Sequence, residues 1–273
     1  GEQTILCGVL QTGSIWAFNK MIEKGVLAGY AANLVQFGWE TIAEELKKGG
    51  LTQMLEGLSD VQKLKVFDLS EDLKALMSPL FKNHMSRILS GEFSQEMMND
   101  WGNKDEKLLR WRSETKETNF EKAESIQARY STAHYFSHAT LLLSLVKAGV
   151  ELAYETMVEN GIKEESAYYE SLHELPLIAN TIARKKLYEM NRIISDTAEY
   201  GCYLFDQECR PLLSDFMSAI DRTHMGGVYS DTAVLSKYNI KQVNQAIENH
   251  SIEHVGKKLR AAMSLVEKEE VHV

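Results

Sequence analysis

Residues that break helices are scarce in this chain of 273 residues, which contains three prolines and 17 glycines. Alternating runs of β-branched residues, which would predict strands, are scarce as well. Apolar residues instead recur at helical spacing along most of the sequence. Hydrophobic residues make up 44% of the chain and charged residues 25%, as in an ordinary globular protein. The sequence therefore predicts an all-α fold of one large or two modest domains.

Cysteines and long hydrophobic runs are also few. Cys7, Cys202 and Cys209 form an odd set without the spacing of a disulfide framework, so we expect buried thiols and a reducing compartment. The apolar run at residues 141–146 is too short to span a membrane, and there is no secretory signal. These absences predict a cytoplasmic protein. Because the chain opens at Gly1 directly in an apolar run, we expect it to be the rear part of a longer polypeptide.

Positive charge is not in excess, since the formal net charge is −9. A nucleic-acid-binding protein would need a basic stripe, so nucleic acid is not expected as a partner. An acidic balance suits a protein that gathers divalent cations. The sequence contains no Gly-x-Gly-x-x-Gly motif and no alternation of strands and helices, so it predicts no dinucleotide site within this chain.

Helical periodicity divides the chain into long segments. Helices are predicted at residues 2–24, about 28–48, 61–89 with a break at Pro79, and 238–270 as one long amphipathic helix. Gly25 and the pair Gly49-Gly50 are expected to end the first two. Residues 103–129 are predicted to be a solvated, partly helical connector, with Trp101 and Trp111 as isolated anchors nearby.

The chain repeats itself at a spacing of 136 positions. The identities include Gly13 with Gly149, Gly25 with Gly161, Met54 with Met190, and Ser59 with Ser195. Farther along the spacing becomes 132, where Pro79 matches Pro211. Chance does not readily align so many identities in one register, so we predict a duplicated helical unit whose copies pack about a pseudo-two-fold axis. The copies are residues 1–125 and 126–265, followed by a flexible tail at 266–273.

Two acids, Glu170 and Glu174, stand four positions apart in the second copy. On a helix both carboxylates leave the same face, beside apolar residues. Such an arrangement is costly unless the acids are paired or bind a metal. The plainer interpretation is a solvated acidic face. The repeats favour a site, because the first copy lacks this pair, whereas Glu2 of the first copy matches His138 of the second.

Carboxylates without a clear set of cysteines or histidines predict a hard cation, Mg²⁺ or Mn²⁺. Ser195 is a hydroxyl that can bind a substrate carboxylate, or else the N-cap of the helix that follows it. Glu170 and His173 also match one unit of a carboxylate-bridged di-iron bundle, whose second unit would fall at Glu269 and His272. The spaced pairs His134 with His138 and His250 with His254 are interpreted as surface histidines.

Three motifs resemble those of ketol-acid reductoisomerases. They are GEQTILCG at residues 1–8, YYESLHELPLI at 168–178 and ISDTAEYG at 194–201. The resemblance extends over essentially the whole chain. Within the family, the chain most resembles the long bacterial class II form, whose C-terminal helical domain is duplicated and knotted. It implies an NADPH-dependent enzyme of valine and isoleucine biosynthesis. It also implies that an N-terminal Rossmann domain, absent from this chain, holds NADPH.

The resemblance also implies roles for four residues. Glu2, Glu170 and Glu174 match acids that hold two Mg²⁺ ions, and Glu174 also relays a proton. Ser195 matches a serine that binds the substrate, a small 2-hydroxy-2-acyl acid. The intact enzyme is expected to be a homo-oligomer, a tetramer, whereas this chain by itself is expected to be inactive. The competing predictions are a non-catalytic helical module for oligomerisation and a di-iron protein.

Overall fold

The computed structural model describes residues 3–230 and 236–271, and all regular structure in these ranges is helical. The α-helices are α1 (Gln3–Glu23), α2 (Ala28–Glu56), α3 (Asp60–Ser90), α4 (Glu92–Gly102), α5 (Glu106–Lys116), α6 (Asn119–Lys122), α7 (Thr132–His138), α8 (Thr140–Glu159), α9 (Glu164–Tyr168), α10 (Leu175–Ile193), α11 (Asp196–Ser218), α12 (Ile240–Glu248) and α13 (Ser251–Val271). A π-helix, η1 (Tyr169–His173), connects α9 to α10. The predicted all-α class is confirmed.

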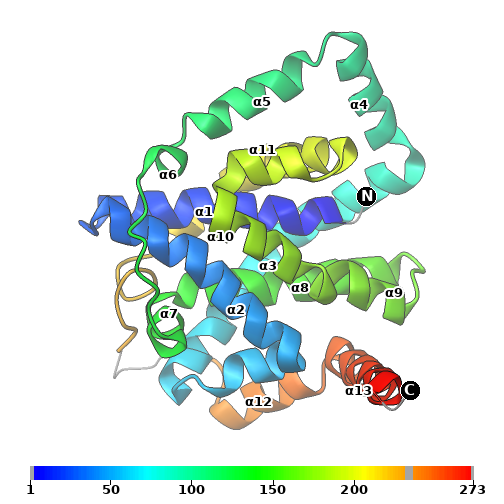
Figure 1. The fold of residues 1–273 in the computed structure, drawn as a ribbon. Helices are drawn as coiled ribbons and strands as arrows, with labels where there is room; N and C mark the ends of the chain where they lie inside the picture. Colours follow the sequence, from blue (N-terminus) through cyan, green and yellow to red (C-terminus); the bar gives the residue numbers. More distant parts are fainter. Residues whose placement is uncertain (1–2, 231–235, 272–273) are drawn as a thin grey trace.

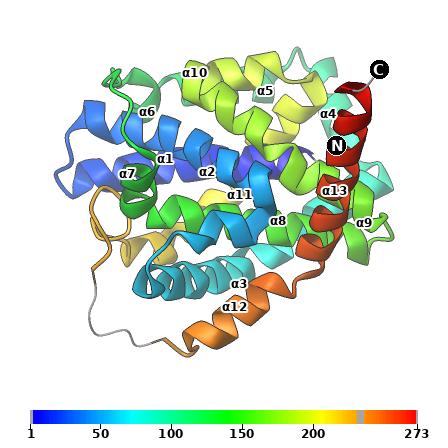
Figure 2. The ribbon, with the colours of Figure 1, turned by 60° about the horizontal axis from the view of Figure 1, so that its bottom comes forward.

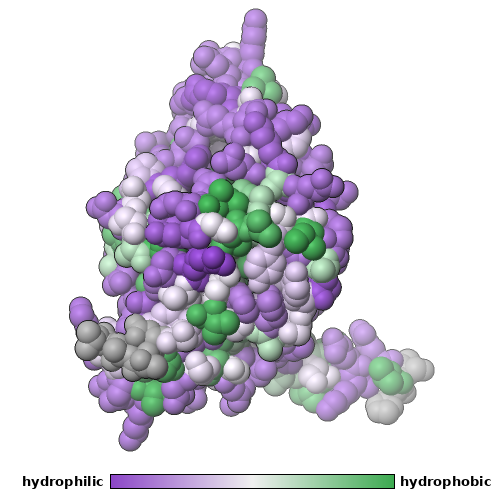
Figure 3. Space-filling model, turned by 90° about the vertical axis from the view of Figure 1, so that its left-hand side faces the viewer, coloured by the Kyte–Doolittle hydropathy of each residue, from purple (hydrophilic) through white to green (hydrophobic). Residues whose placement is uncertain are grey.

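The core is built around α1 and α8, which are apolar on nearly every side. A helix of that kind must be covered all round. α1 packs along α11, α8 packs along α3, and α2 packs along α10 (Figures 1 and 2). On the face in Figure 3, hydrophobic residues form only small groups among hydrophilic ones. In the described part of the chain, no helix is both long and apolar enough to cross a bilayer.

Backbone geometry repeats at the spacing found in the sequence. Gly25 and Gly161 both have positive φ, at 85° and 84°. Gly50 breaks α2 at φ 78° and ψ −162°, and Lys186, which is 136 positions later, breaks α10 at φ 59° and ψ −158°. The main packing pairs also correspond, because α1 on α11 matches α8 on α3. These correspondences support the duplication, whereas the axis, the knot and the domain limits stay predictions.

Two predicted helix boundaries are wrong. Pro79 does not break α3, because the proline lies on the exposed side of the helix, where the carbonyl that it leaves unpaired can bind water. The segment 238–270 is not one helix but two, α12 and α13. The two helices meet at His250, whose Nδ1 accepts a hydrogen bond from the Ile252 N–H of α13 and whose Nε2 lies 2.8 Å from the Glu155 carboxylate on α8.

The helix breaks and the chain end also differ in detail from the prediction. α2 is interrupted at Gly49-Gly50, as predicted, but resumes and continues to Glu56. α13 is helical through Val271. The flexibility of the tail at 266–273 stays a prediction.

The predicted solvated connector is partly buried. α4 and α5 form an arm that stands away from α1 and α8 (Figure 1). Within it, the Trp111 ring packs against Tyr200 of α11, with ring centres 5.1 Å apart, and Phe120 of α6 has no exposed surface. Trp101 is instead 72% exposed. The connector is therefore held to the core by Trp111 and Phe120.

Candidate functional site

The acid pair lies where three helical segments join. Glu170 is part of η1, and Glu174 stands between η1 and the start of α10. Pro176 occupies the first turn of α10, where a proline costs no hydrogen bond. The stretch is helical throughout, so the spacing of four places both acids on one side of it. A π turn is rare and often marks a functional site.

Both acids are half-buried. Leu172 and Leu175, beside them in the chain, are each 1% exposed. An ionised carboxylate at such a boundary loses hydration that a charged partner or a metal must replace. The fully solvated face considered from the sequence therefore does not describe this pair.

The first turns of α1 approach the same place. α1 contacts both η1 and α10. Burial raises the pKa of the Cys7 thiol to about 12, and the negative charge of Glu174 contributes to the rise. Glu2, the acid predicted to complete the set, lies outside the described residues. Its place beside Glu170 and Glu174 stays a prediction.

The chemistry of these groups suits Mg²⁺. Magnesium prefers carboxylate oxygens, and Cys7 is no competing soft ligand because its raised pKa keeps the thiol protonated. Within residues 3–230 and 236–271, no three His, Cys, Asp or Glu side chains gather into a metal-binding group. A Mg²⁺ site at Glu170 and Glu174 would need a further ligand, and Glu2, the acid that the sequence predicts, lies outside these ranges.

Ser195 caps the helix that follows it. Its Oγ accepts a hydrogen bond from the Ala198 backbone N–H at 3.1 Å, so the N-cap interpretation is confirmed. The residue is exposed. A serine hydroxyl that accepts one bond still has its own proton to donate. The N-cap role therefore leaves Ser195 able to bind an anion, and the positive end of α11 favours one there.

α11 and α1 run side by side in the same direction. The Phe205 side chain lies against Gly8, and farther along, the Thr12 hydroxyl donates to the Asp206 carboxylate at 2.8 Å. Still farther along, Trp16 and Ser214 line one pocket. The N-terminal ends of α1 and α11 therefore lie at the same end of the core. The first turns of α1 and the Ser195 cap of α11 therefore lie at this same end of the core.

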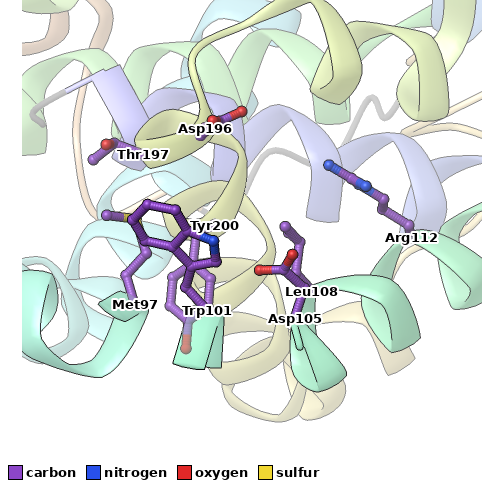
Figure 4. A pocket seen from close by; sticks show the side chains of 8 residues that line it. All are labelled: Met97, Trp101, Asp105, Leu108, Arg112, Asp196, Thr197 and Tyr200. Atoms are coloured by element: carbon purple, nitrogen blue, oxygen red, sulfur yellow. The ribbon is translucent and has the colours of Figure 1, made fainter. Parts of the chain in front are cut away.

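A pocket of about 380 Å³ adjoins the first turn of α11. Figure 4 shows Met97 and Trp101 from the arm on one side and Arg112 on the other. The Arg112 guanidinium binds the buried Glu199 carboxylate through two hydrogen bonds of 2.7 and 2.8 Å. Sequence reasoning missed this pair. Glu199 stands inside the ISDTAEYG motif, but nothing local marks a partner that is 87 positions away.

Three of the four histidines interpreted as surface residues are half-buried and bonded. His134 Nε2 lies 2.7 Å from the Tyr30 hydroxyl, and its ring stacks on His138 at 4.0 Å. His250 is bonded to Glu155, whereas His254 is exposed. The interpretation is therefore wrong for His134, His138 and His250. For His134 and His250 it failed because their partners, Tyr30 and Glu155, come from helices distant in the sequence, whereas His138 is bonded within α7, to Ser137 and the His134 carbonyl.

Comparison with known proteins gives one consistent result. A family model described as "Ketol-acid reductoisomerase, C-terminal domain" matches residues 1–129 and 134–265. Proteins named "Ketol-acid reductoisomerase (NADP(+))" from Flavobacterium johnsoniae and Marinomonas sp. are 56% identical to the chain over 98% of its length. The protein of that name from Klebsiella pneumoniae is 56% identical over 97%. The chain spans about half of these relatives, 55%, 55% and 54% of their lengths.

Proposed function

Because this chain belongs to the ketol-acid reductoisomerase family, as its C-terminal domain, we propose that it is the metal- and substrate-binding part of an NADPH-dependent ketol-acid reductoisomerase. The proposed substrate is 2-acetolactate. It is rearranged by alkyl migration and reduced to 2,3-dihydroxy-3-methylbutanoate, a step toward valine. The proposal concerns the whole enzyme, of which this chain corresponds to about half, judged by the length of its relatives.

The acids of the site are proposed to hold two Mg²⁺ ions. Glu170 and Glu174 offer half-buried carboxylates on one side of the η1 segment, and Glu2 is proposed to add a third. Bound Mg²⁺ supplies Lewis-acid polarisation of the substrate's ketone and alkoxide oxygens. Glu174 is also proposed to accept and return a proton, as carboxylates do in general acid–base catalysis.

Substrate binding is assigned to Ser195. Its hydroxyl donates to the substrate carboxylate, and the first backbone N–H groups of α11 add a favourable dipole. The observation that carries the proposal is the contact of α1 with both η1 and α10, the two segments that flank Glu174, in a core where α1 and α11 begin at the same end. It supports one site built from segments that are far apart in the sequence.

NADPH is proposed to be held by a separate nucleotide-binding domain of the whole enzyme. The described residues form helices and no strand, so they do not supply the strand–turn–helix cradle of dinucleotide sites. Without a cofactor held against the substrate there is no hydride transfer. We therefore expect this chain alone to show no NADPH oxidation.

The duplicated architecture belongs to the same proposal. The family model matches two stretches, and the backbone breaks at Gly50 and Lys186 correspond at a spacing of 136. Both observations support two copies related by a pseudo-two-fold axis, of which one carries the acid pair. A homo-oligomer, a tetramer, and a cytoplasmic location are proposed from the family resemblance.

The two other functions considered from the sequence gain no support. A module that only assembles would have no reason to place half-buried acids beside the end of α1. The di-iron interpretation needs a second unit at Glu269 and His272, and His272 lies outside the described residues. Neither is proposed further.

The direct test is turnover after a nucleotide-binding domain is supplied. The chain is fused to the N-terminal half of the Flavobacterium johnsoniae relative, and oxidation of NADPH is followed with 2-acetolactate and Mg²⁺. We expect turnover that requires Mg²⁺ and falls by at least about 100-fold in Glu174→Gln and Ser195→Ala, given typical effects of acid–base and positioning groups. Metal-independent turnover, or full activity in both variants, contradicts the proposal.

A further inference from the structure

The break in α10 is held by contacts in both directions with α6. The backbone N–H groups of Leu187 and Tyr188 donate to Oε1 of Glu121 at 2.6 and 3.1 Å. In return, Lys186 Nζ donates to the Phe120 carbonyl at 2.9 Å and to the Ala123 carbonyl. Glu121 and Lys186 thus join the two segments as a clasp.

Lys186 has a backbone conformation that is otherwise nearly confined to glycine. Its φ of 59° and ψ of −158° strain any residue with a side chain, so the surroundings must stabilise it. The carboxylate of Glu121 does so by satisfying N–H groups that lose their partners when a helix restarts. The ammonium group of Lys186 does so by binding the last carbonyls of α6.

The first copy has a corresponding contact at its own break. After Gly50, the N–H groups of Leu51 and Thr52 donate to the Glu253 carboxylate of α13 at 3.1 and 2.6 Å. Leu51 and Leu187 are 136 positions apart, and Glu253 follows Glu121 by 132, the two spacings of the repeat. Each copy therefore caps the broken helix of the other. The first break needs no lysine, because glycine tolerates the conformation.

Only the second break lies within the helix that connects two residues of the candidate site, Glu174 and Ser195. The segments η1 and α10 on either side of Glu174 both contact α1, where the charge of Glu174 reaches Cys7, and 17 positions later the Asn191 side chain donates to Gln11 at 3.0 Å. An unbroken helix would separate residues 174 and 191 by about 26 Å, yet Cys7 and Gln11 are only about 6 Å apart along α1. The break at Lys186 folds α10 back, so both of its ends meet adjacent turns of α1.

We propose that Glu121 and Lys186 are positioning residues of the candidate site. Their clasp holds the break in α10 and so brings Ser195, four residues after Asn191, to the end of the core where Glu174 lies. The inference rests on the proposed function for its catalytic meaning. Glu121 and Lys186 do not touch the substrate, and they act only through the position of Ser195.

The duplication supplies a matched control. Glu121→Gln and Glu253→Gln remove the same charge from the same kind of cap. Residues 34, 38 and 59 lie around the first break and correspond to Glu170, Glu174 and Ser195 at the spacing of 136, but they carry no acid pair. Both variants are made in the fusion with the relative's nucleotide-binding domain. Thermal unfolding is recorded together with kcat and KM for 2-acetolactate in Mg²⁺.

Both variants are expected to lower the unfolding temperature to a similar degree. Glu121→Gln is expected to lower kcat/KM by about 10- to 100-fold, the range for a small misplacement of a binding group, and Glu253→Gln by less than about twofold. Glu121→Asp, which keeps the charge, is expected to recover part of the loss. Equal kinetic effects of Glu121→Gln and Glu253→Gln overturn the positioning role.

A double-mutant cycle with Ser195→Ala shows whether Glu121 acts through Ser195. In the Ser195→Ala background, Glu121→Gln is expected to have less than about a threefold further effect on kcat/KM. An undiminished effect there overturns the inference. If the unaltered fusion shows no Mg²⁺-dependent turnover, the proposed function fails instead, which is a separate result.

Discussion

Lys147 and Glu151 form a buried ion pair on the side of α8 that faces α3. We predict that removing one of the two charges lowers the stability of the protein more than removing both. Lys147 Nζ lies 2.6 Å from Glu151, and both side chains are almost fully buried. After Glu151→Gln, Lys147 keeps only Glu71 at 3.7 Å and the Phe67 ring at 4.6 Å. Breaking a buried pair from one side typically costs 3–5 kcal/mol, so with Glu71 still nearby we expect a loss of about 3 kcal/mol.

Replacing both charges by apolar groups should cost little. In Lys147→Met with Glu151→Leu, the neighbouring Lys74 and His250 side chains keep a partner, since their nitrogens lie 2.7 and 2.8 Å from the Glu155 carboxylate. No buried charge is then left alone, and we expect the double variant to lie within about 1 kcal/mol of the unaltered protein.

Urea unfolding at pH 7.5, followed by circular dichroism and by tryptophan fluorescence, measures these differences. Agreement of the two probes checks that the transition is two-state. The exposed pair Lys122 and Glu117, 2.7 Å apart, is the control, and Glu117→Gln should have no measurable effect. If the double variant loses as much stability as Glu151→Gln, the reasoning is refuted.

Two further variants test the core. Gly8→Ala places a Cβ against the Phe205 side chain and should cost about 1–3 kcal/mol by overpacking, whereas Gly57→Ala meets open space and should cost nothing; equal stabilities in urea would contradict this. Burial lowers the pKa of His84 to about 4, helped by the charge of Arg87, against 6.5 when unfolded. The unfolded chain then binds the proton first, so stability should fall by about 2 kcal/mol between pH 6.5 and 5. His84→Phe should remove this loss of stability between pH 6.5 and 5. If stability depends on pH as strongly in His84→Phe as in the unaltered protein, His84 is not the cause of the loss.

The helices were predictable because the buried face of each one appears in the sequence as apolar residues at helical spacing. The N-cap interpretation of Ser195 was open to sequence reasoning for the same reason, since a cap depends on residues one turn away. The repeat at 136 positions predicted two corresponding copies, and the matching positive φ of Gly25 and Gly161 supports it. Gly49-Gly50 marked the first helix break for the same local reason.

The second break could not be predicted, because Lys186 is not a residue that breaks helices. It is held open by Glu121, which is 65 positions away in the sequence and has no local signature. The junction of α12 and α13 likewise involves a distant contact, that of His250 with Glu155. For the site, spacing predicted that Glu170 and Glu174 share one side, but not the π turn or the contacts of η1 and α10 with α1.

The central claim is that Glu174 belongs to a Mg²⁺ site, and calorimetric titration of this chain with Mg²⁺ tests it most directly. We expect weak binding by the unaltered chain and by Glu165→Gln, which removes an exposed acid from α9, because each carboxylate of the site attracts the cation. Glu174→Gln keeps the shape of the side chain but removes its charge, and should abolish the binding. Binding of equal strength in Glu174→Gln and Glu165→Gln, or no binding by the unaltered chain, would contradict the account.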